Sequence, residues 1–192
     1  MNNLKIFAYL TISITPLVLI YYVRKKYKKK LATLDNVDNS NVPCGNSCSF
    51  YDLQFILRYI DNAQHSISLC MYLLTSHEIQ NSLIRLHNKG VKVRYITDAV
   101  MAQNPASKIQ YLQKQGLTIK VQPKQRDNLL HHKFCLVDEN HPQNSKVLFG
   151  TLNLTLQGLT TNFDTVLFTN NKIVIERYKD EFELLWSKFK EV

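Results

Sequence analysis

The pattern of apolar and polar positions after residue 49 predicts helices and short strands in alternation. Ser49 can cap a helix over about 50–63, where apolar residues recur at helical spacing: Phe50, Leu53, Ile56, Leu57 and Ile60. The compact apolar run from Ser66 to Leu73 is typical of a buried strand. Ser76 then opens a second helix that ends at Gly90, with an apolar face of Ile79, Leu83 and Leu86.

The same alternation continues to the end of the chain. A third helix, from about Pro105 to Gln115, is expected between strands at Val91–Ile96 and Leu117–Val121. Three further strands are expected at Lys133–Val137, Lys146–Phe149 and Thr165–Phe168. The last helix covers about 172–189, with an inward face of Ile175, Tyr178, Phe182, Leu185 and Trp186. This order predicts an α/β domain with a central mixed sheet flanked by helices.

The first thirty residues have the pattern of a membrane anchor. Ile6 to Val23 are eighteen consecutive uncharged positions, which as a helix would span roughly 27 Å. A basic cluster, Arg24 to Lys30, follows, whereas only Lys5 precedes the run, and this asymmetry places the following domain in the cytosol. A cleaved secretory signal has the opposite order of charge. We therefore expect an anchor with a polybasic flank at 1–30, a linker at 31–49 and a folded domain at 50–192.

Composition narrows the class of protein. The 192 residues are 45% hydrophobic with only 5 Gly and 5 Pro, which excludes a collagen-like chain and argues against wholesale disorder. The formal net charge is +9. Residues 82–133 hold ten basic against two acidic side chains, so much of the excess outside the first forty residues is central. That charge indicates a polyanionic partner, nucleic acid or an anionic membrane, although a solvated basic face remains an alternative.

The residues that carry chemistry are concentrated between 131 and 164. His131 and Lys133 are two apart, so on a strand they project from the same face. Lys133 can neutralise a phosphoryl group that His131 attacks or protonates. Thr151 and Asn153, again two apart, offer a hydroxyl and an amide to phosphate oxygens. Asp164 is a carboxylate able to hold an imidazole N–H and fix its tautomer.

Together these residues resemble the phospholipase D superfamily, whose H-x-K-x4-D pattern is matched here by His131, Lys133 and Asp138. The family's G-[ST]-x-N turn is matched by Gly150 to Asn153. The resemblance implies a phospholipase D-like fold and a two-step, metal-independent phosphodiester hydrolysis through a phosphohistidine on His131. It also implies that Lys133, Thr151 and Asn153 bind the nonbridging oxygens. A chain with one such motif would then form a homodimer, in which a second copy supplies the other histidine.

Other residues near the motif have less direct roles. Asp164 would orient His131, and Asp138 would organise the site rather than react. His132 is a weaker candidate than His131 because neighbouring strand residues point to opposite faces. The sequence departs from the family pattern at three places: Thr151 instead of serine, Leu154 instead of an aromatic residue, and a lengthened hairpin at Glu139–Val147 that we expect near the site.

The short chain, single motif and expected anchor are most similar to mitochondrial phospholipase D-like proteins of the Zucchini type. That resemblance implies an endonuclease for single-stranded RNA, acting in piwi-interacting RNA maturation at the mitochondrial outer membrane. The alternative substrate is cardiolipin, cleaved to phosphatidate. A third alternative is an anchored scaffold that binds RNA or lipid without cutting it. All the expected motif residues are present, which disfavours the scaffold.

The cysteines bear on a possible structural zinc, which the Zucchini type carries between anchor and domain. Here only Cys44 and Cys48 lie in that region, and two ligands do not complete a tetrahedral site. Cys70 and Cys135 lie within apolar runs and are expected in the core. We expect no cofactor to be needed for catalysis.

Overall fold

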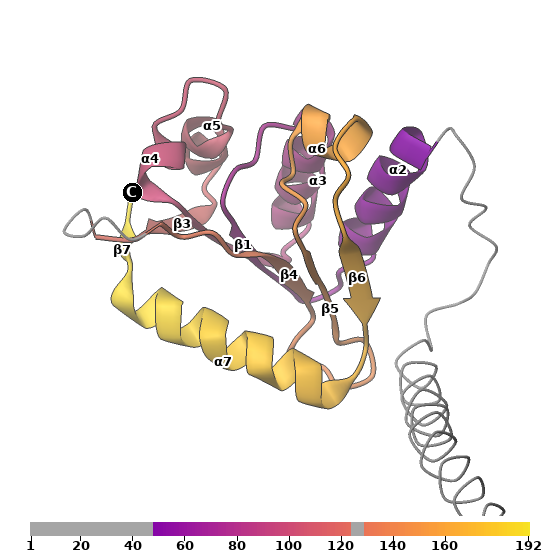
Figure 1. Ribbon diagram of the computed structural model, residues 1–192. Helices are drawn as coiled ribbons and strands as arrows, with labels where there is room; N and C mark the ends of the chain where they lie inside the picture. The colour runs from indigo at the N-terminus through magenta and orange to yellow at the C-terminus, as the bar shows by residue number, and fades with distance from the viewer. Residues whose placement is uncertain (1–47, 124–128) are drawn as a thin grey trace, which may run out of the picture. The chain divides into compact units, whose positions relative to one another are not determined.

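The computed structural model describes residues 48–123 and 129–192, which form one sheet of seven strands (Figure 1). Their order is β6-β5-β4-β1-β2-β3-β7. The strands β1, β2 and β3 are parallel. On the other side of β1, each of β4, β5 and β6 is antiparallel to the strand beside it, and at the far edge β7 is antiparallel to β3. The expected mixed sheet is confirmed. Strand bounds are β1 Ser66–Met71, β2 Lys92–Thr97, β3 Thr118–Val121, β4 Lys133–Val137, β5 Lys146–Gly150, β6 Val166–Thr169 and β7 Lys190–Glu191.

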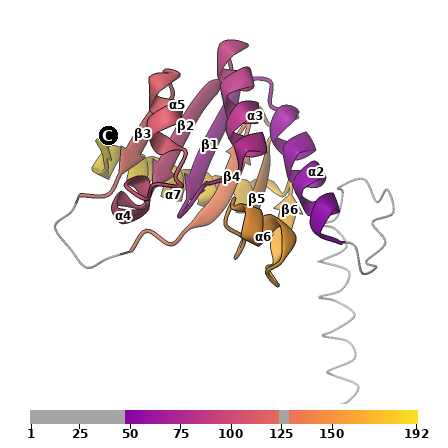
Figure 2. The same cartoon turned by 90° about the horizontal axis from the view of Figure 1, so that it is seen from above.

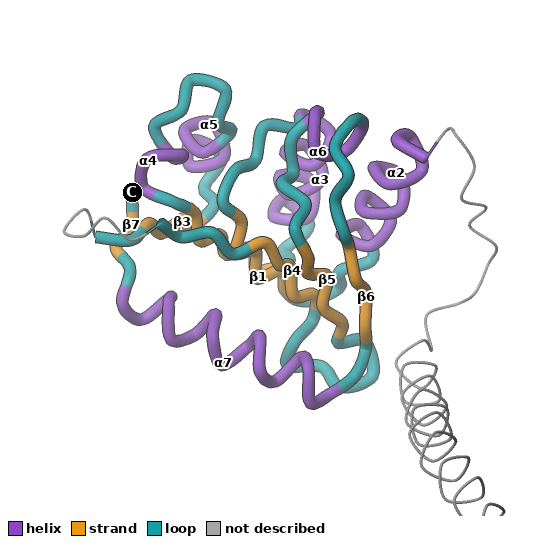
Figure 3. Tube along the Cα trace, viewed as in Figure 1, coloured by secondary structure: helices purple, strands orange, loops and turns teal. Residues whose placement is uncertain are grey.

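Helices cover both faces of this sheet, as Figure 3 shows with strands in orange and helices in purple. One face is covered by several helices, whose bounds are α2 Cys48–Asp61, α3 His77–Asn88, α4 Ala99–Ala102, α5 Ile109–Lys114 and α6 Leu156–Thr160. The long α7, Lys172–Lys188, lies across the opposite face. The fold is therefore a three-layer α/β arrangement in which both faces of the sheet are buried.

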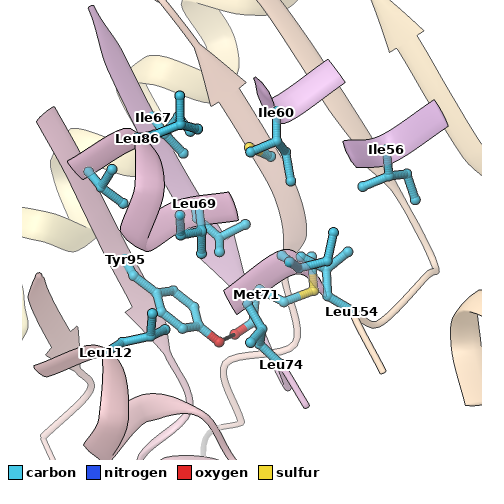
Figure 4. Close-up of a cluster of buried hydrophobic side chains, with 14 of the residues drawn as sticks. Ile56, Ile60, Ile67, Leu69, Met71, Leu74, Leu86, Tyr95, Leu112 and Leu154 are labelled. Atoms are coloured by element: carbon cyan, nitrogen blue, oxygen red, sulfur yellow. Dashed lines mark hydrogen bonds between the residues drawn. The ribbon is translucent and has the colours of Figure 1, made fainter. Parts of the chain in front are cut away.

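Strand β1 is buried on both faces, and its residues are apolar except for Ser66 and Ser68. Ile67, Leu69 and Met71 point into the core beneath α2 and α3, which Figure 4 shows together with Ile56 and Ile60 of α2. The alternate residue Cys70 points into the second core, under α7. A strand buried on both faces needs apolar side chains at successive positions, so it appears as a continuous run.

The α7 face has its own core. Ile175 and Phe182 are buried there against Phe134 and Leu136 of β4, and Tyr178 and Trp186 pack against the same cluster. Rings of Phe182 and Trp186 stack with centroids 5.6 Å apart. The inward face predicted for the last helix is confirmed.

The third predicted helix is present but shorter than expected, because α5 begins at Ile109 and not near Pro105. A separate short helix, α4, lies before it and was not expected. Asp98 caps α4 earlier in the chain, accepting from the amides of Val100 and Met101. A turn follows in which the Ser107 amide donates to the Asn104 carbonyl at 2.8 Å, so Pro105 lies in that turn.

Smaller differences concern the ends of elements. Ser49 lies inside α2, which begins at Cys48, and therefore does not precede the helix as a cap. The short α6 and the two-residue β7 were not expected. Ser76 does cap α3, because its side chain accepts from the Ile79 amide. Gly90 follows α3 with φ 90°, a conformation that glycine adopts without strain.

The predicted anchor at 1–30 and most of the linker at 31–49 lie outside the described residues, as does Cys44. Within 48–123 and 129–192, none of the helices has the length and apolar character needed to cross a bilayer.

Candidate active site

The predicted catalytic and phosphate-binding residues other than Asp138 lie at one edge of the sheet, where β1 and β2 end. The register pairs Met71 with Lys133 and Gly150 with Val166, so β4 and β6 begin where β1 and β5 finish. Figure 2 shows α4 and α6 at this same end of the sheet. The carboxyl ends of parallel strands are the usual ligand-binding edge of an open α/β sheet. Chain topology thus brings together the segments that carry His131, Thr151 and Asp164.

His131 and Lys133 are in direct contact. The Lys133 ammonium lies 3.1 Å from Nε2 of His131 and donates to its carbonyl at 3.0 Å. A protonated lysine can only donate, so Nε2 accepts this hydrogen bond and carries the lone pair. The His131 side chain is exposed, whereas Lys133 is only 7% exposed. An accessible nucleophilic nitrogen therefore lies beside a shielded positive charge.

The neighbouring histidine points the other way, as the strand period predicted. His132 Nε2 lies 3.2 Å from Glu181 Oε1 on α7, and its ring packs edge-on against Phe134. The side chains of Cys135 and Val137, which alternate with the same period as Lys133, lie on the other face of the sheet, the one covered by α2 to α6. His132 is thus separated from the His131–Lys133 pair by the sheet itself.

Tyr72 supports this pair from the end of β1. Its amide donates to the His132 carbonyl at 3.0 Å, and its ring lies edge-on to the His131 imidazole, with centroids 4.9 Å apart. The Lys133 ammonium lies 5.4 Å from the centre of the same ring. Sequence reasoning missed Tyr72, and the only signal for it was an aromatic residue immediately after a buried strand.

The surroundings of Lys133 shift the pKa of its ammonium group. Desolvation lowers the pKa of Lys133, and the negative charge of Asp164 acts in the opposite direction. A phosphate anion arriving at Lys133 would add a second favourable charge.

Thr151 and Asp164 are joined across the ends of β5 and β6. The Thr151 hydroxyl donates to Asp164 Oδ1 at 2.7 Å and accepts from the Thr165 amide at 2.9 Å. The Asp164 carboxylate therefore accepts from Thr151 in this structure, and the predicted hydrogen bond from an imidazole N–H of His131 to Asp164 is not formed among the described residues. Gly150 allows the close approach, because a Cβ there would lie 1.9 Å from the Thr165 carbonyl oxygen.

Asn153 and Leu154 complete the turn. Asn153 Oδ1 is buried and has no hydrogen-bond partner among the described residues, so its carboxamide retains capacity for a ligand. Leu154 is 1% exposed, and its carbonyl accepts from the amides of Thr75 and Ser76. The family's aromatic residue is thus replaced here by a leucine that packs in the core and does not line the site.

Asp138 lies away from the other motif residues. It follows the far end of β4, about 17 Å along the strand from Lys133, and is fully buried. Its carboxylate accepts from the backbone amides of Gln64, His65 and Ser66 at 2.7–3.3 Å. Asp138 therefore fastens β4 to the start of β1 at the edge opposite His131.

The hairpin at Glu139–Val147 lies at this opposite edge too, so the expectation that it is near the site is wrong. It connects the end of β4 to the start of β5, and the His141 ring stacks on His65 with centroids 3.7 Å apart. The lengthening therefore changes the surface behind the site. Strand β4 runs from one edge of the sheet to the other, so residues that follow it lie far from His131 in space although they are close to it in sequence.

The described cysteines belong to the core. Cys70 and Cys135 are free and buried, and burial raises the pKa of the Cys135 thiol to about 12. Nowhere in 48–123 or 129–192 do three or more His, Cys, Asp or Glu residues form a group suited to a metal ion. Cys44 and the Cys48 side chain, the weak zinc candidates, lie outside the described residues.

Comparison with known proteins gives a matching family model and several curated relatives. Residues 56–186 match the family model described as cardiolipin synthase, PLD-like domain. The chain is 33% identical over 134 residues to the mitochondrial cardiolipin hydrolase of Xenopus tropicalis, covering 70% of this chain and 60% of that protein. It is 34% identical over 151 residues to the Mus musculus protein of the same name, covering 78% and 65%. This chain thus spans about three fifths of the length of these curated relatives.

Solved structures share the fold. The phospholipase D family member Nuc from Salmonella typhimurium superposes with a TM-score of 0.64 at 22% identity, covering 73% of this chain and 90% of Nuc. NucT from Helicobacter pylori gives a TM-score of 0.67 at 19% identity, covering 75% and 92%.

Proposed function

The chain belongs to the phospholipase D-like domain family, and from this premise we propose that it hydrolyses phosphodiesters through a phosphohistidine on His131. One observation carries the proposal most directly: an exposed imidazole and a shielded ammonium lie 3.1 Å apart at the ligand-binding edge of the sheet. Thr151, Asn153 and Asp164 lie on the segments that border this pair.

The proposed mechanism gives each group one step. As phosphate binds, the Lys133 ammonium transfers its hydrogen bond from Nε2 to a nonbridging oxygen, which frees the lone pair. Nε2 of His131 then attacks phosphorus, the P–O bond to the leaving group breaks, and a second histidine protonates the departing oxygen. In the second step that histidine removes a proton from water, whose oxygen attacks phosphorus and breaks the P–N bond. Lys133, Thr151 and Asn153 stabilise the charge on the nonbridging oxygens.

The second histidine is the reason to propose a homodimer. The chain has one His131–Lys133 motif, and His132 faces α7, so it cannot serve the same phosphate. A twofold-related copy would supply its own His131 to a shared site. The unpartnered Asn153 Oδ1 is consistent with a site that is completed by further groups.

The leading substrate is single-stranded RNA, in the maturation of piwi-interacting RNA. The net charge of +8 over residues 82–133 supports this choice, since basic side chains follow a phosphate backbone. The alternative is cardiolipin, cleaved to phosphatidate, which the name of the curated relatives favours. For either substrate we propose that residues 1–30 anchor the chain in the mitochondrial outer membrane, with the domain in the cytosol.

The test uses the full chain in detergent on labelled single-stranded RNA and on cardiolipin vesicles, each with a chelator present. We expect His131→Ala to abolish cleavage and His132→Ala, the matched control on the other face, to retain it. Equal behaviour of wild type and His131→Ala on both substrates would refute the catalytic proposal. Activity that disappears with the chelator alone would refute metal independence. Comparison of the two substrates decides between nuclease and lipase.

A further inference from the structure

Asp98 lies at the carboxyl end of β2, on the same edge of the sheet as His131, and is 1% exposed. Its two carboxylate oxygens have different partners. Oδ1 accepts from the amides of Val100 and Met101, at 2.9 and 3.1 Å, and thereby caps α4. Oδ2 accepts from the Leu130 amide at 3.2 Å and from Nε2 of Gln122 at 2.5 Å.

The second set of partners is unusual for a helix cap. A cap needs only one oxygen, which binds amides of its own helix. Leu130 is 32 residues away in sequence and immediately precedes His131. Gln122 follows β3 and Leu130 precedes β4, so one carboxylate binds residues from both segments.

His131 is therefore held on both sides. Before it, the Leu130 amide is bound to Asp98, and after it, the His132 carbonyl is bound to the Tyr72 amide at 3.0 Å. Tyr72 is fixed in turn, because the Thr97 hydroxyl donates to its carbonyl at 3.2 Å. The adjacent residues Thr97 and Asp98 thus support both ends of the segment 130–132. Since β4 begins only at Lys133, the sheet ladder does not itself fix His131.

We infer that Asp98 is a positioning residue for His131, acting through the Leu130 amide, an inference that rests on the proposed function. An in-line attack on phosphorus requires Nε2 to be held within a few tenths of an ångström of its productive position. Loss of the Leu130 attachment, which leaves only the hydrogen bonds at the His131 and His132 carbonyls, would widen that distribution. It would slow the chemical step and leave phosphate binding by Lys133, Thr151 and Asn153 intact.

The decisive variant is Asp98→Ser. A serine hydroxyl still caps α4, because serine ranks with aspartate at this position, but it is too short to reach Leu130 as well. We expect kcat of the full chain to fall by about tenfold to a hundredfold, with KM changed by less than about twofold. Asn171→Ala is the matched control. Asn171 lies at the opposite edge of the sheet and caps α7, because its Oδ1 accepts from the amides of Ile173 and Val174.

Two further measurements separate positioning from a general loss of stability. Hydrogen exchange of the Leu130 amide should accelerate in Asp98→Ser and not in Asn171→Ala. The imidazole ¹⁵N resonances of His131 should shift in the same variant alone. Unchanged kcat and unchanged His131 resonances in Asp98→Ser would overturn the inference, as would an equal fall of kcat in both variants.

The proposed function and this inference fail in distinguishable ways. If wild-type chain and His131→Ala cleave neither substrate, the proposed function is refuted, and the ¹⁵N resonances still decide whether Asp98 fixes His131. If wild type is active, His131→Ala is inactive and Asp98→Ser retains full kcat, only the role of Asp98 is refuted.

Discussion

Lys133 illustrates how a single side chain acquires its chemistry from its surroundings. Its ammonium is shielded by the strand and by Tyr72, and this desolvation lowers its pKa, while the carboxylate of Asp164 partly compensates. In the proposed mechanism, the charge that neutralises the phosphate therefore belongs to a group that loses its proton at lower pH than an exposed lysine does.

This dependence predicts the alkaline limit of activity. As pH rises through the lowered pKa of Lys133, the ammonium becomes neutral, and kcat/KM should fall at a lower pH than an ordinary lysine would give. In Lys133→Arg the charge persists to higher pH, so the residual activity should keep a flatter alkaline limb. The measurement is a pH profile of kcat/KM for both proteins, and identical alkaline limbs would contradict the prediction.

Asp138 should matter for stability and not for chemistry. Asp138→Ala removes the acceptor for three backbone amides, and we expect the free energy of unfolding to fall by about 2–4 kcal/mol. Asp138→Asn should cost less, because asparagine tolerates the φ of 51° and keeps one acceptor oxygen. Urea denaturation measures the loss. A specific fall in kcat of the folded Asp138→Ala protein would instead restore the role expected from the sequence.

The sequence was informative about residues whose relation is local. His131 and Lys133 could be placed on one face because a strand alternates every two residues, and the same rule correctly placed His132 on the other. The contacts of Asp98 with Leu130 and of Tyr72 with His132 could not be foreseen, because they join residues 32 and 60 positions apart. Such contacts depend on which strands become neighbours.

At the level of elements, the end of β5 lies very close to Thr165, the residue that precedes β6. The Gly150 α-carbon faces the Thr165 carbonyl, and the Thr151 amide and hydroxyl both bind Thr165 backbone groups. This contact sets the distance between the two strands and so brings Thr151 to Asp164.

Gly150→Ala should force these strands apart. The added methyl would lie 1.9 Å from a backbone oxygen, which cannot move aside as a flexible side chain could. We expect a clear loss of thermal stability together with at least a tenfold loss of kcat/KM, since Thr151 would no longer meet Asp164. Gly90→Ala is the control, because no atom lies within 4 Å of the place that its added methyl would take, although its φ still carries a backbone cost. Equal losses of kcat/KM in both variants would contradict this explanation.

Elements with a sustained apolar period were predicted well, and short ones were not. The long α7 and the buried β1 and β4 follow directly from their spacing. The four-residue α4, which starts after the Asp98 cap, was not predicted because so short a helix shows no period. The five-residue α6 was not predicted for the same reason.

For the whole molecule, the proposed shared site has a quantitative consequence. If each active centre needs two copies of His131, a dimer of one wild-type and one His131→Ala chain contains no complete centre. When the two chains are co-folded in varying proportion, activity should fall as the square of the wild-type fraction. A linear fall would contradict the shared site and indicate that each chain acts alone. The control mixes wild type with His132→Ala, for which activity should stay constant.

The hydrogen bonds from the amides of residues 64–66 to Asp138 also bear on the order in which the chain folds. They join segments 72–74 residues apart, and the intervening stretch contains β2, β3 and their helices. Closing so long a loop is entropically costly, so this contact should be absent from the folding transition state and form among the last. Asp138→Ala should then leave the refolding rate nearly unchanged and accelerate unfolding, which stopped-flow fluorescence of Trp186 can measure. The hydrogen bonds of Asp138 would thus form only after the edge bearing His131 has assembled, and they would slow unfolding.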